Sequence, residues 1–272
     1  MAKYKKKRAR ELKHDKFRDW TLKFFDRLGD QLEGKGRTIL YGIGGVVILA
    51  VLIGVFLKWS HRRDDQARQA LGRAIAIASQ SVATTPPATP TSSPSFASEQ
   101  ERAQKAIEEF QKVAAKYGEP YRSEARYFIA TNLLLVDRAK GLSELTELSK
   151  SSNREVATLS KFALAQAKEA DGKYDEAGAL YKELAAQNNN VITPETANLR
   201  LAMVYEKQGK KKEAADLLFN IVEAARKAKD DADNTPLPQS QAAREAAQEL
   251  QKLDPDRYAQ LTPEAPANNL PF

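Results

Sequence analysis

The feature that most constrains this chain is an apolar run of twenty residues, 38–57, which contains no charged side chain. Because an α-helix rises about 1.5 Å per residue, a helix of this length spans the ~30 Å hydrocarbon core of a bilayer. A buried core helix is the alternative, but such helices rarely run so long without a polar residue. We therefore predict a transmembrane helix over residues 38–58, with Tyr41 and Trp59 as interfacial aromatic residues.

The surrounding sequence favours an uncleaved anchor over a signal peptide, because the charged stretch SHRRDDQ follows the run where a cleavage site needs small residues. Residues 1–37 hold 13 Lys or Arg and 6 Asp or Glu, whereas residues 38–272 hold 30 of each. Basic segments favour the cytoplasmic side, although Lys58, Arg62 and Arg63 behind the run weaken this bias. We predict a single-pass membrane protein with a cytoplasmic N-terminus and its C-terminal domain on the opposite side of the membrane.

The basic segment before the apolar run also carries aromatic residues at helical spacing, namely Phe17, Trp20 and Phe24. This pattern predicts an amphipathic helix that lies on the inner leaflet, where its lysines and arginines meet anionic headgroups. The alternative is a solvated basic tail that only sets the topology.

The charge distribution argues against nucleic acid as a partner. The net charge of +7 belongs entirely to residues 1–37, and the remainder of the chain is neutral overall. A nucleic-acid-binding domain would carry basic residues on its folded part. We expect proteins and membrane lipid as partners, and no nucleic acid.

Residues that usually carry catalysis are scarce. The chain has no cysteine, which excludes a disulfide framework, a thiolate nucleophile and a cysteine-containing zinc site. Its two histidines, His14 and His61, have no second ligand or nucleophile at useful spacing, and there is no serine nucleophile elbow. We predict a protein that is not an enzyme, with no cofactor, no metal site and no small-molecule substrate.

Small residues recur in the C-terminal part with a period near 35 residues. Four anchor residues, each opening the second helix of a predicted hairpin, are spaced by 36, 35 and 37 residues: Ala106, Leu142, Ala177 and Ala214. Small residues precede the last three anchors by twelve positions (Ala130, Ala165, Ala202), and large residues follow three anchors by four positions (Phe110, Tyr181, Leu218). This period indicates stacked helical hairpins, each burying its apolar face against the next.

Local signals set the boundaries of this region. Thr193-Pro194-Glu195 combines an N-cap, a first-turn proline and an acid, which predicts a helix from about residue 194. Residues 82–98 hold 12 Pro, Ser or Thr among 17, which predicts a disordered insert within the first hairpin, after an opening helix over 62–81. The stretch 239–253 predicts a terminal helix with a polar outer face, before a flexible tail over 254–272.

The predicted fold is therefore all-α, a single N-terminal transmembrane helix followed by a helical-hairpin solenoid. The expected parts are a basic segment over 1–37, the membrane helix over 38–58, the solenoid over 59–253 with its insert over 82–98, and the tail.

The repeated residues resemble the tetratricopeptide repeat, a helix-turn-helix unit. Gly172, Tyr174, Ala177 and Tyr181 match its turn and second helix in one unit, as do Tyr205, Gly209 and Ala214 in the next. Asp137 departs from the pattern, because it stands where the turn glycine is expected.

The resemblance implies a concave groove lined by the first helix of each hairpin. Carried over position by position, its partner-facing residues are Tyr127, Thr131, Phe162, Gln166, Leu199 and Met203. These residues suit an apolar groove for an extended or helical segment better than a clamp for an acidic C-terminus. The alternative for each is an ordinary place in the core between helices.

The whole layout, with LKHDKF at residues 12–17, one apolar span and degenerate repeats, resembles the bacterial family of ancillary SecYEG translocon subunits. The resemblance implies a bacterial inner-membrane protein whose C-terminal domain is periplasmic. It also implies a non-enzymatic scaffold that contacts the translocon, periplasmic chaperones or emerging chains. Two alternatives remain: an anchored scaffold for envelope assembly or cell division, and a membrane-surface protein that acts through its basic N-terminal helix.

Overall fold

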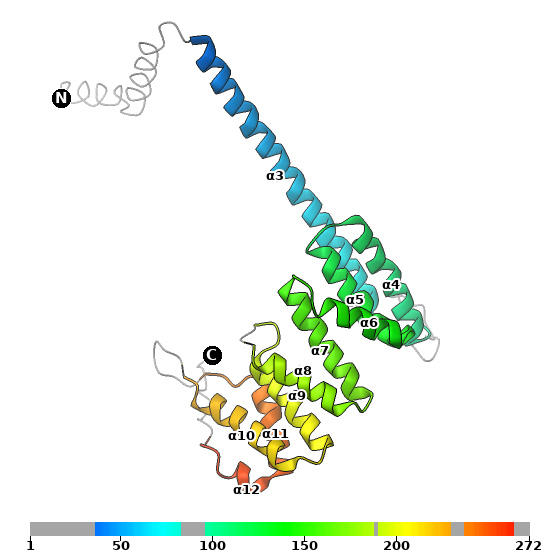
Figure 1. Cartoon of the computed structure of the whole chain (residues 1–272), viewed down its shortest axis with the longest axis vertical. Helices are drawn as coiled ribbons and strands as arrows, with labels where there is room; N and C mark the ends of the chain where they lie inside the picture. The colour runs from blue at the N-terminus through cyan, green and yellow to red at the C-terminus, as the bar shows by residue number, and fades with distance from the viewer. Residues whose placement is uncertain (1–35, 83–95, 188–189, 230–236, 264–272) are drawn as a thin grey trace, which may run out of the picture. The chain divides into compact units, whose positions relative to one another are not determined.

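The computed structural model describes residues 36–82, 96–187, 190–229 and 237–263 (Figure 1). All regular secondary structure in these ranges is helical, which confirms the all-α prediction. The chain divides into two compact units, residues 1–65 and 66–272. The predicted amphipathic helix and its residues Phe17, Trp20 and Phe24 lie outside the described residues, as do the side chains of Tyr41 and Trp59.

Helix α3 (Gly36–Ala78) begins in the first unit and contains the apolar run. Residues 48–55 of α3 are all exposed. Over the described side chains, no helix meets the length and apolarity needed to cross a membrane. The end of α3 forms the expected opening helix of the first hairpin, and it stops at Ala78, three residues before the predicted end at 81.

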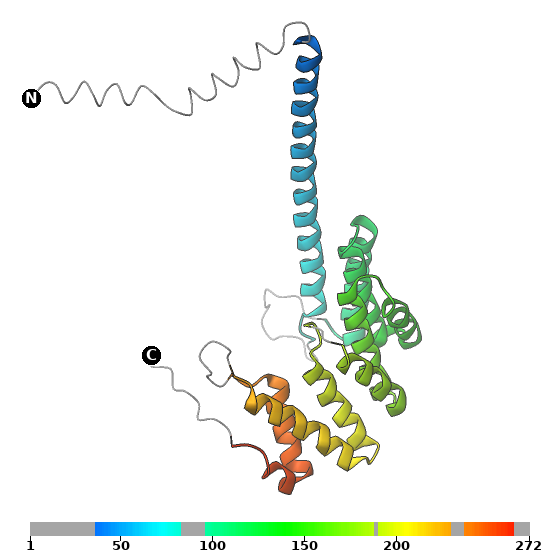
Figure 2. The same cartoon turned by 60° about the vertical axis from the view of Figure 1, so that its left-hand side comes forward.

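The second unit consists of successive helices, shown from two directions in Figures 1 and 2. After the end of α3 these are α4 (Glu99–Lys116), α5 (Tyr121–Val136), α6 (Arg138–Leu148), α7 (Arg154–Ala170), α8 (Tyr174–Ala185), α9 (Pro194–Lys207), α10 (Lys211–Lys227), α11 (Gln241–Leu253) and α12 (Pro255–Tyr258). From α4 on, each helix packs against the next along the chain, and α5 also touches α7 as α9 touches α11. Contacts between neighbours in sequence are what a helical solenoid requires.

The core of the second unit confirms most of the repeat pattern. Ala106, Ala177 and Ala214 are fully buried at the helix crossings, and so are the earlier small residues Ala130, Ala165 and Ala202. Phe110, Tyr181 and Leu218, four residues after their anchors, are buried in three separate apolar clusters. Each cluster joins one hairpin to the next, so the hairpins share their cores as predicted.

The anchor of α6 is Gly141, which corrects the predicted Leu142. Gly141 is the fourth residue of α6, as Ala177 is of α8 and Ala214 of α10. A Cβ on Gly141 would lie 2.8 Å from the backbone nitrogen of Leu134 in α5, so only glycine fits this crossing. The corrected anchor also places Leu145, which is completely buried, four residues further on, where the other repeats have Phe110, Tyr181 and Leu218.

The turns within the hairpins have two kinds of chemistry. Gly172 and Gly209 follow α7 and α9 with φ of 71° and 77°, a left-handed conformation that favours glycine. Asp137 instead joins α5 to α6 as a single residue, and its side chain accepts a hydrogen bond from the Lys140 amide at 3.1 Å. The aspartate therefore replaces a glycine turn by capping the following helix.

The predicted helix start at 194 is confirmed, because α9 begins at Pro194 with Thr193 as its N-cap. The predicted terminal helix is α11, capped by Ser240. Folded structure continues further than expected, since α12 and the residues up to Thr262 pack on α10 and correct the tail boundary at 254. Most of the predicted insert, 83–95, lies outside the described residues.

Candidate binding surface

The first helix of each hairpin is the element on which a concave surface depends. Contacts that skip one helix along the chain join α5 with α7, α9 with α11, and α10 with α12. The first two join first helices of neighbouring hairpins. In a solenoid such contacts place the first helices along one face. The six residues expected to face a partner lie on α5, α7 and α9.

On α5, Tyr127 and Thr131 are half-buried. The Tyr127 ring meets the Phe128 ring edge-on at 5.4 Å, and burial raises the pKa of the Tyr127 hydroxyl. The Thr131 hydroxyl donates to the Phe128 carbonyl oxygen at 3.0 Å. The hydrogen-bonding capacity of Thr131 is thus partly used within its own helix.

On α7, Phe162 is half-buried and Gln166 is exposed. The Phe162 ring lies edge-on to Tyr181 at 5.8 Å, which fixes it against α8. The Tyr181 hydroxyl donates to Glu169 at 2.9 Å, and burial, followed by the nearby Glu169 charge, raises the pKa of Tyr181. Phe162 is therefore packed against α8, whereas the polar side chain of Gln166 is exposed to solvent.

On α9, Leu199 is only 3% exposed and belongs to the cluster formed with α10 and α11. Leu199 is therefore a core residue, which corrects its assignment to the groove. Met203 is half-buried at the edge of the same cluster, with an Arg200 nitrogen 3.8 Å from its sulfur. A terminal helix that covers Leu199 explains the difference, because the repeat pattern predicts α11 but not its register against α9.

Besides the half-buried Thr131, four predicted groove residues remain at least partly accessible to solvent. Three are half-buried with apolar surface, and one is an exposed glutamine. They are Tyr127, Phe162, Gln166 and Met203. Their side chains supply aromatic and thioether surface with one exposed amide, a surface suited to a peptide or helix of another protein.

A hollow that the sequence analysis did not predict lies at the turns α7–α8 and α9–α10. Its volume is about 430 Å³, and its lining residues are Gly172, Lys173, Tyr174, Asp175, Glu176, Gln208 and Lys210. Gln208 donates to Asp175 at 2.8 Å, and Lys210 donates to Gln208 at 2.9 Å. Because Gln208 and Asp175 belong to neighbouring repeats, their hydrogen bond joins the two repeats at this hollow. The signal for it is the 33-residue separation of Asp175 and Gln208, close to one repeat period.

Across the described ranges, no group of three or more acidic or histidine side chains is arranged to hold a metal ion. Comparisons with known protein families, with curated proteins and with solved structures find no match to this chain.

Proposed function

We propose that this chain is a membrane-anchored, non-enzymatic scaffold whose helical-hairpin domain binds other proteins. The resemblance to ancillary SecYEG subunits supports a partner close to the Sec translocon, such as a translocon subunit, a periplasmic chaperone or an emerging chain. The anchor and the binding surface have separate support and separate tests.

The observation that carries the anchor is the exposure of successive apolar residues in α3. Ile48, Leu52 and Val55 are 62%, 60% and 62% exposed, and the residues between them are exposed as well. Eight successive helical positions point to all sides of the helix, since each residue turns it by about 100°. A bilayer would cover every side at once, whereas a partner helix would cover only one.

Extraction of membranes with alkaline carbonate tests the anchor. The variant Leu52→Lys with Val55→Lys puts two charges at membrane depth, at about 3 kcal/mol each, and should release the chain into the soluble fraction. The matched control changes Leu135 and Val136, two exposed apolar residues of α5, to lysine and should stay with the membranes. Release of the unaltered chain by carbonate would refute the anchor.

The proposed orientation puts residues 62–272 in the periplasm, which follows from the basic segment at 1–37. Protease added to spheroplasts should degrade the C-terminal domain and leave an N-terminal epitope intact. Protection of the domain until the cells are lysed would reverse the orientation.

The half-buried aromatic and thioether side chains on α5, α7 and α9 support the binding surface. A photoreactive amino acid at Gln166, an exposed residue of α7, should crosslink partner proteins in intact membranes. The same amino acid at Lys182, an exposed residue of the second helix α8, is the control and should give little product.

The identity of the crosslinked protein separates the candidate partners. Translocon subunits, chaperones or nascent chains support the secretion role, whereas envelope-assembly or division proteins support the other scaffold. Equal crosslinking from both positions would refute the groove. A deletion of residues 1–34 that abolishes capture would transfer the function to the basic segment.

A further inference from the structure

The C-terminal residues after α11 lie along one stripe of α10. The stripe consists of Asp216, Phe219, Glu223 and Arg226, whose spacing of three and four residues places them on one side of the helix. All four side chains are half-buried. We call these four residues the α10 stripe and Pro255–Thr262 the C-terminal cap.

The corresponding positions in the other hairpins are open to solvent. Counted from the anchors, the residues that correspond to Phe219 are Gln111 in α4, Thr146 in α6 and Lys182 in α8, and each is exposed. The other hairpins therefore carry a polar residue where α10 carries an aromatic ring. The stripe of α10 is a specialised surface, because an uncovered Phe219 would cost hydrophobic free energy that Lys182 does not.

In the first half of the cap, the Arg257 side chain contacts the α10 stripe. The Arg257 guanidinium lies 2.5 Å from an Asp216 carboxylate oxygen and sits over the Phe219 ring, 5.1 Å from its centre. The Arg226 guanidinium of the stripe lies over the ring of Tyr258, 5.6 Å from its centre. The helix and the cap thus each place an arginine over an aromatic ring of the other, and Arg257 also pairs with a carboxylate of the helix.

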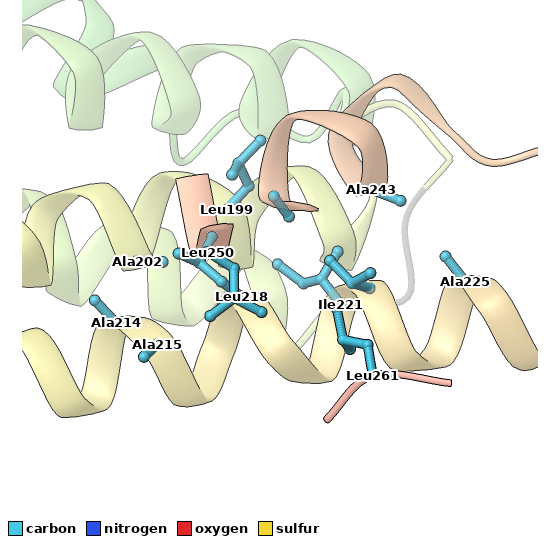
Figure 3. Packing of buried hydrophobic residues seen from close by; sticks show 12 residues of the cluster. Leu199, Ala202, Ala214, Ala215, Leu218, Ile221, Ala225, Ala243, Leu250 and Leu261 are labelled. Carbon is cyan, nitrogen blue, oxygen red and sulfur yellow. The ribbon is translucent and has the colours of Figure 1, made fainter. Parts of the chain in front are cut away.

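The second half of the cap ends on Thr262. Its amide donates to Glu223 at 3.1 Å, its hydroxyl donates to the same carboxylate at 3.0 Å, and Arg226 donates to its carbonyl oxygen at 2.7 Å. Leu261, the residue before it, is buried beside Ile221 in the apolar cluster (Figure 3). The stripe therefore forms hydrogen bonds with both the backbone and the side chain of Thr262.

We propose that the α10 stripe is a peptide-docking site and that the C-terminal cap occupies it in cis as a releasable plug. The ligand class is a short segment with Arg-Tyr, two spacer residues and then Leu-Thr, as in Arg257 to Thr262. The occupant is this chain's own segment. The site lies on a second helix, so it is distinct from the groove proposed for the first helices.

A displacement experiment with the chain in detergent tests the proposal. One variant ends at Leu253, and the probe is a fluorescein-labelled peptide with the sequence of residues 254–263, measured by fluorescence anisotropy. An attached segment acts at an effective concentration near 1 mM, so the peptide should bind the shortened chain at least about tenfold more tightly than the full chain. A peptide with Leu261→Asp should bind neither chain.

Two outcomes of this experiment would overturn the docking site. One is equal binding of the peptide to both chains. The other is no binding to a shortened chain whose helix content and melting temperature equal those of the full chain.

Hydrogen exchange of the full-length chain covers the case in which the shortened chain fails to fold. Glu223→Gln should speed the exchange of amides 256–262 while those of α11 keep their rate, and Glu213→Gln on an exposed side of α10 is the control. Equal acceleration in α11 would show that the cap is an inseparable part of the terminal hairpin, and unchanged exchange would show that the stripe does not hold it. Either result would overturn the proposal.

Discussion

The Arg138 guanidinium donates to the Asp171 carboxylate at 2.8 Å and so joins the turn of one hairpin to the turn of the next. Another nitrogen of Arg138 donates to the Ala167 carbonyl oxygen in the last turn of α7, also at 2.8 Å. The next pair of turns is joined in a similar way by Gln208 and Asp175, and both contacts span 33 residues. Polar contacts along this edge therefore follow the repeat, in addition to the apolar contacts inside it.

Arg138→Ala should lower the free energy of unfolding by about 1–2 kcal/mol, because a charge-assisted bond and a C-terminal carbonyl partner are both lost. Thermal melting of the full chain in detergent, followed by far-UV circular dichroism, measures the effect. Lys140→Ala, at an exposed position two residues later, is the control and should stay within about 0.5 kcal/mol. Equal effects of the two substitutions would contradict a specific role for Arg138.

Two helical glycines respond in opposite directions to a methyl group. Gly141→Ala should destabilise the chain by about 1–3 kcal/mol, because its Cβ would meet the α5 backbone at 2.8 Å, where no side chain can yield. Gly178→Ala should be neutral or stabilise by up to about 1 kcal/mol, since its Cβ would meet Leu201 and Val204 side chains at 3.6 Å. Chemical denaturation of both variants measures the difference, and a stabilising Gly141→Ala would disprove the close crossing.

The helical hairpins could be predicted because each signal is local. Thr193 and Pro194 start α9 by their own chemistry, and Ala177 and Ala214 repeat at helix crossings whose geometry demands small residues. Gly141 was missed because Asp137 shortens the turn before it to one residue, which shifts the small position relative to the expected period.

The candidate sites depended on packing that no local pattern contains. Leu199 fits the groove register, yet α11 covers it, and the extent of that cover depends on the tertiary arrangement. Nothing in the local sequence distinguishes Phe219 from a core residue of an amphipathic helix. Its partner Arg257 lies in a proline-containing stretch that predicted a flexible tail. The contact between the two residues depends on tertiary packing, so the sequence alone does not predict the stripe.

Leu145 and Thr146 distinguish the corrected register of α6 from the predicted one. Leu145 is completely buried, so Leu145→Ala should cost about 2–5 kcal/mol of folding free energy. Thr146, the residue four places after Leu142, is exposed, and Thr146→Ala should change stability by less than about 0.5 kcal/mol. Denaturant titration of the two variants is the measurement, and a larger loss for Thr146→Ala would restore Leu142 as the anchor.

The Glu223 carboxylate makes the stability of the C-terminal cap depend on pH. The Lys227 ammonium and then the Thr262 amide lower the pKa of Glu223 from an ordinary value of 4.5 to about 2. Because the folded-state pKa is the lower one, the stabilisation is complete above pH 4.5 and is lost as the pH falls towards about 2.

The melting temperature of Glu223→Gln should therefore lie below that of the unaltered chain at pH 7. The difference between them should shrink as the pH falls from 4.5 and disappear only below about pH 2, where the glutamate is protonated in the folded chain and resembles the amide. Glu213→Gln, on an exposed side of α10, controls for the loss of one negative charge and should show no such trend. A difference that stays constant down to pH 2 would mean that Glu223 holds the cap by shape and not through its charge.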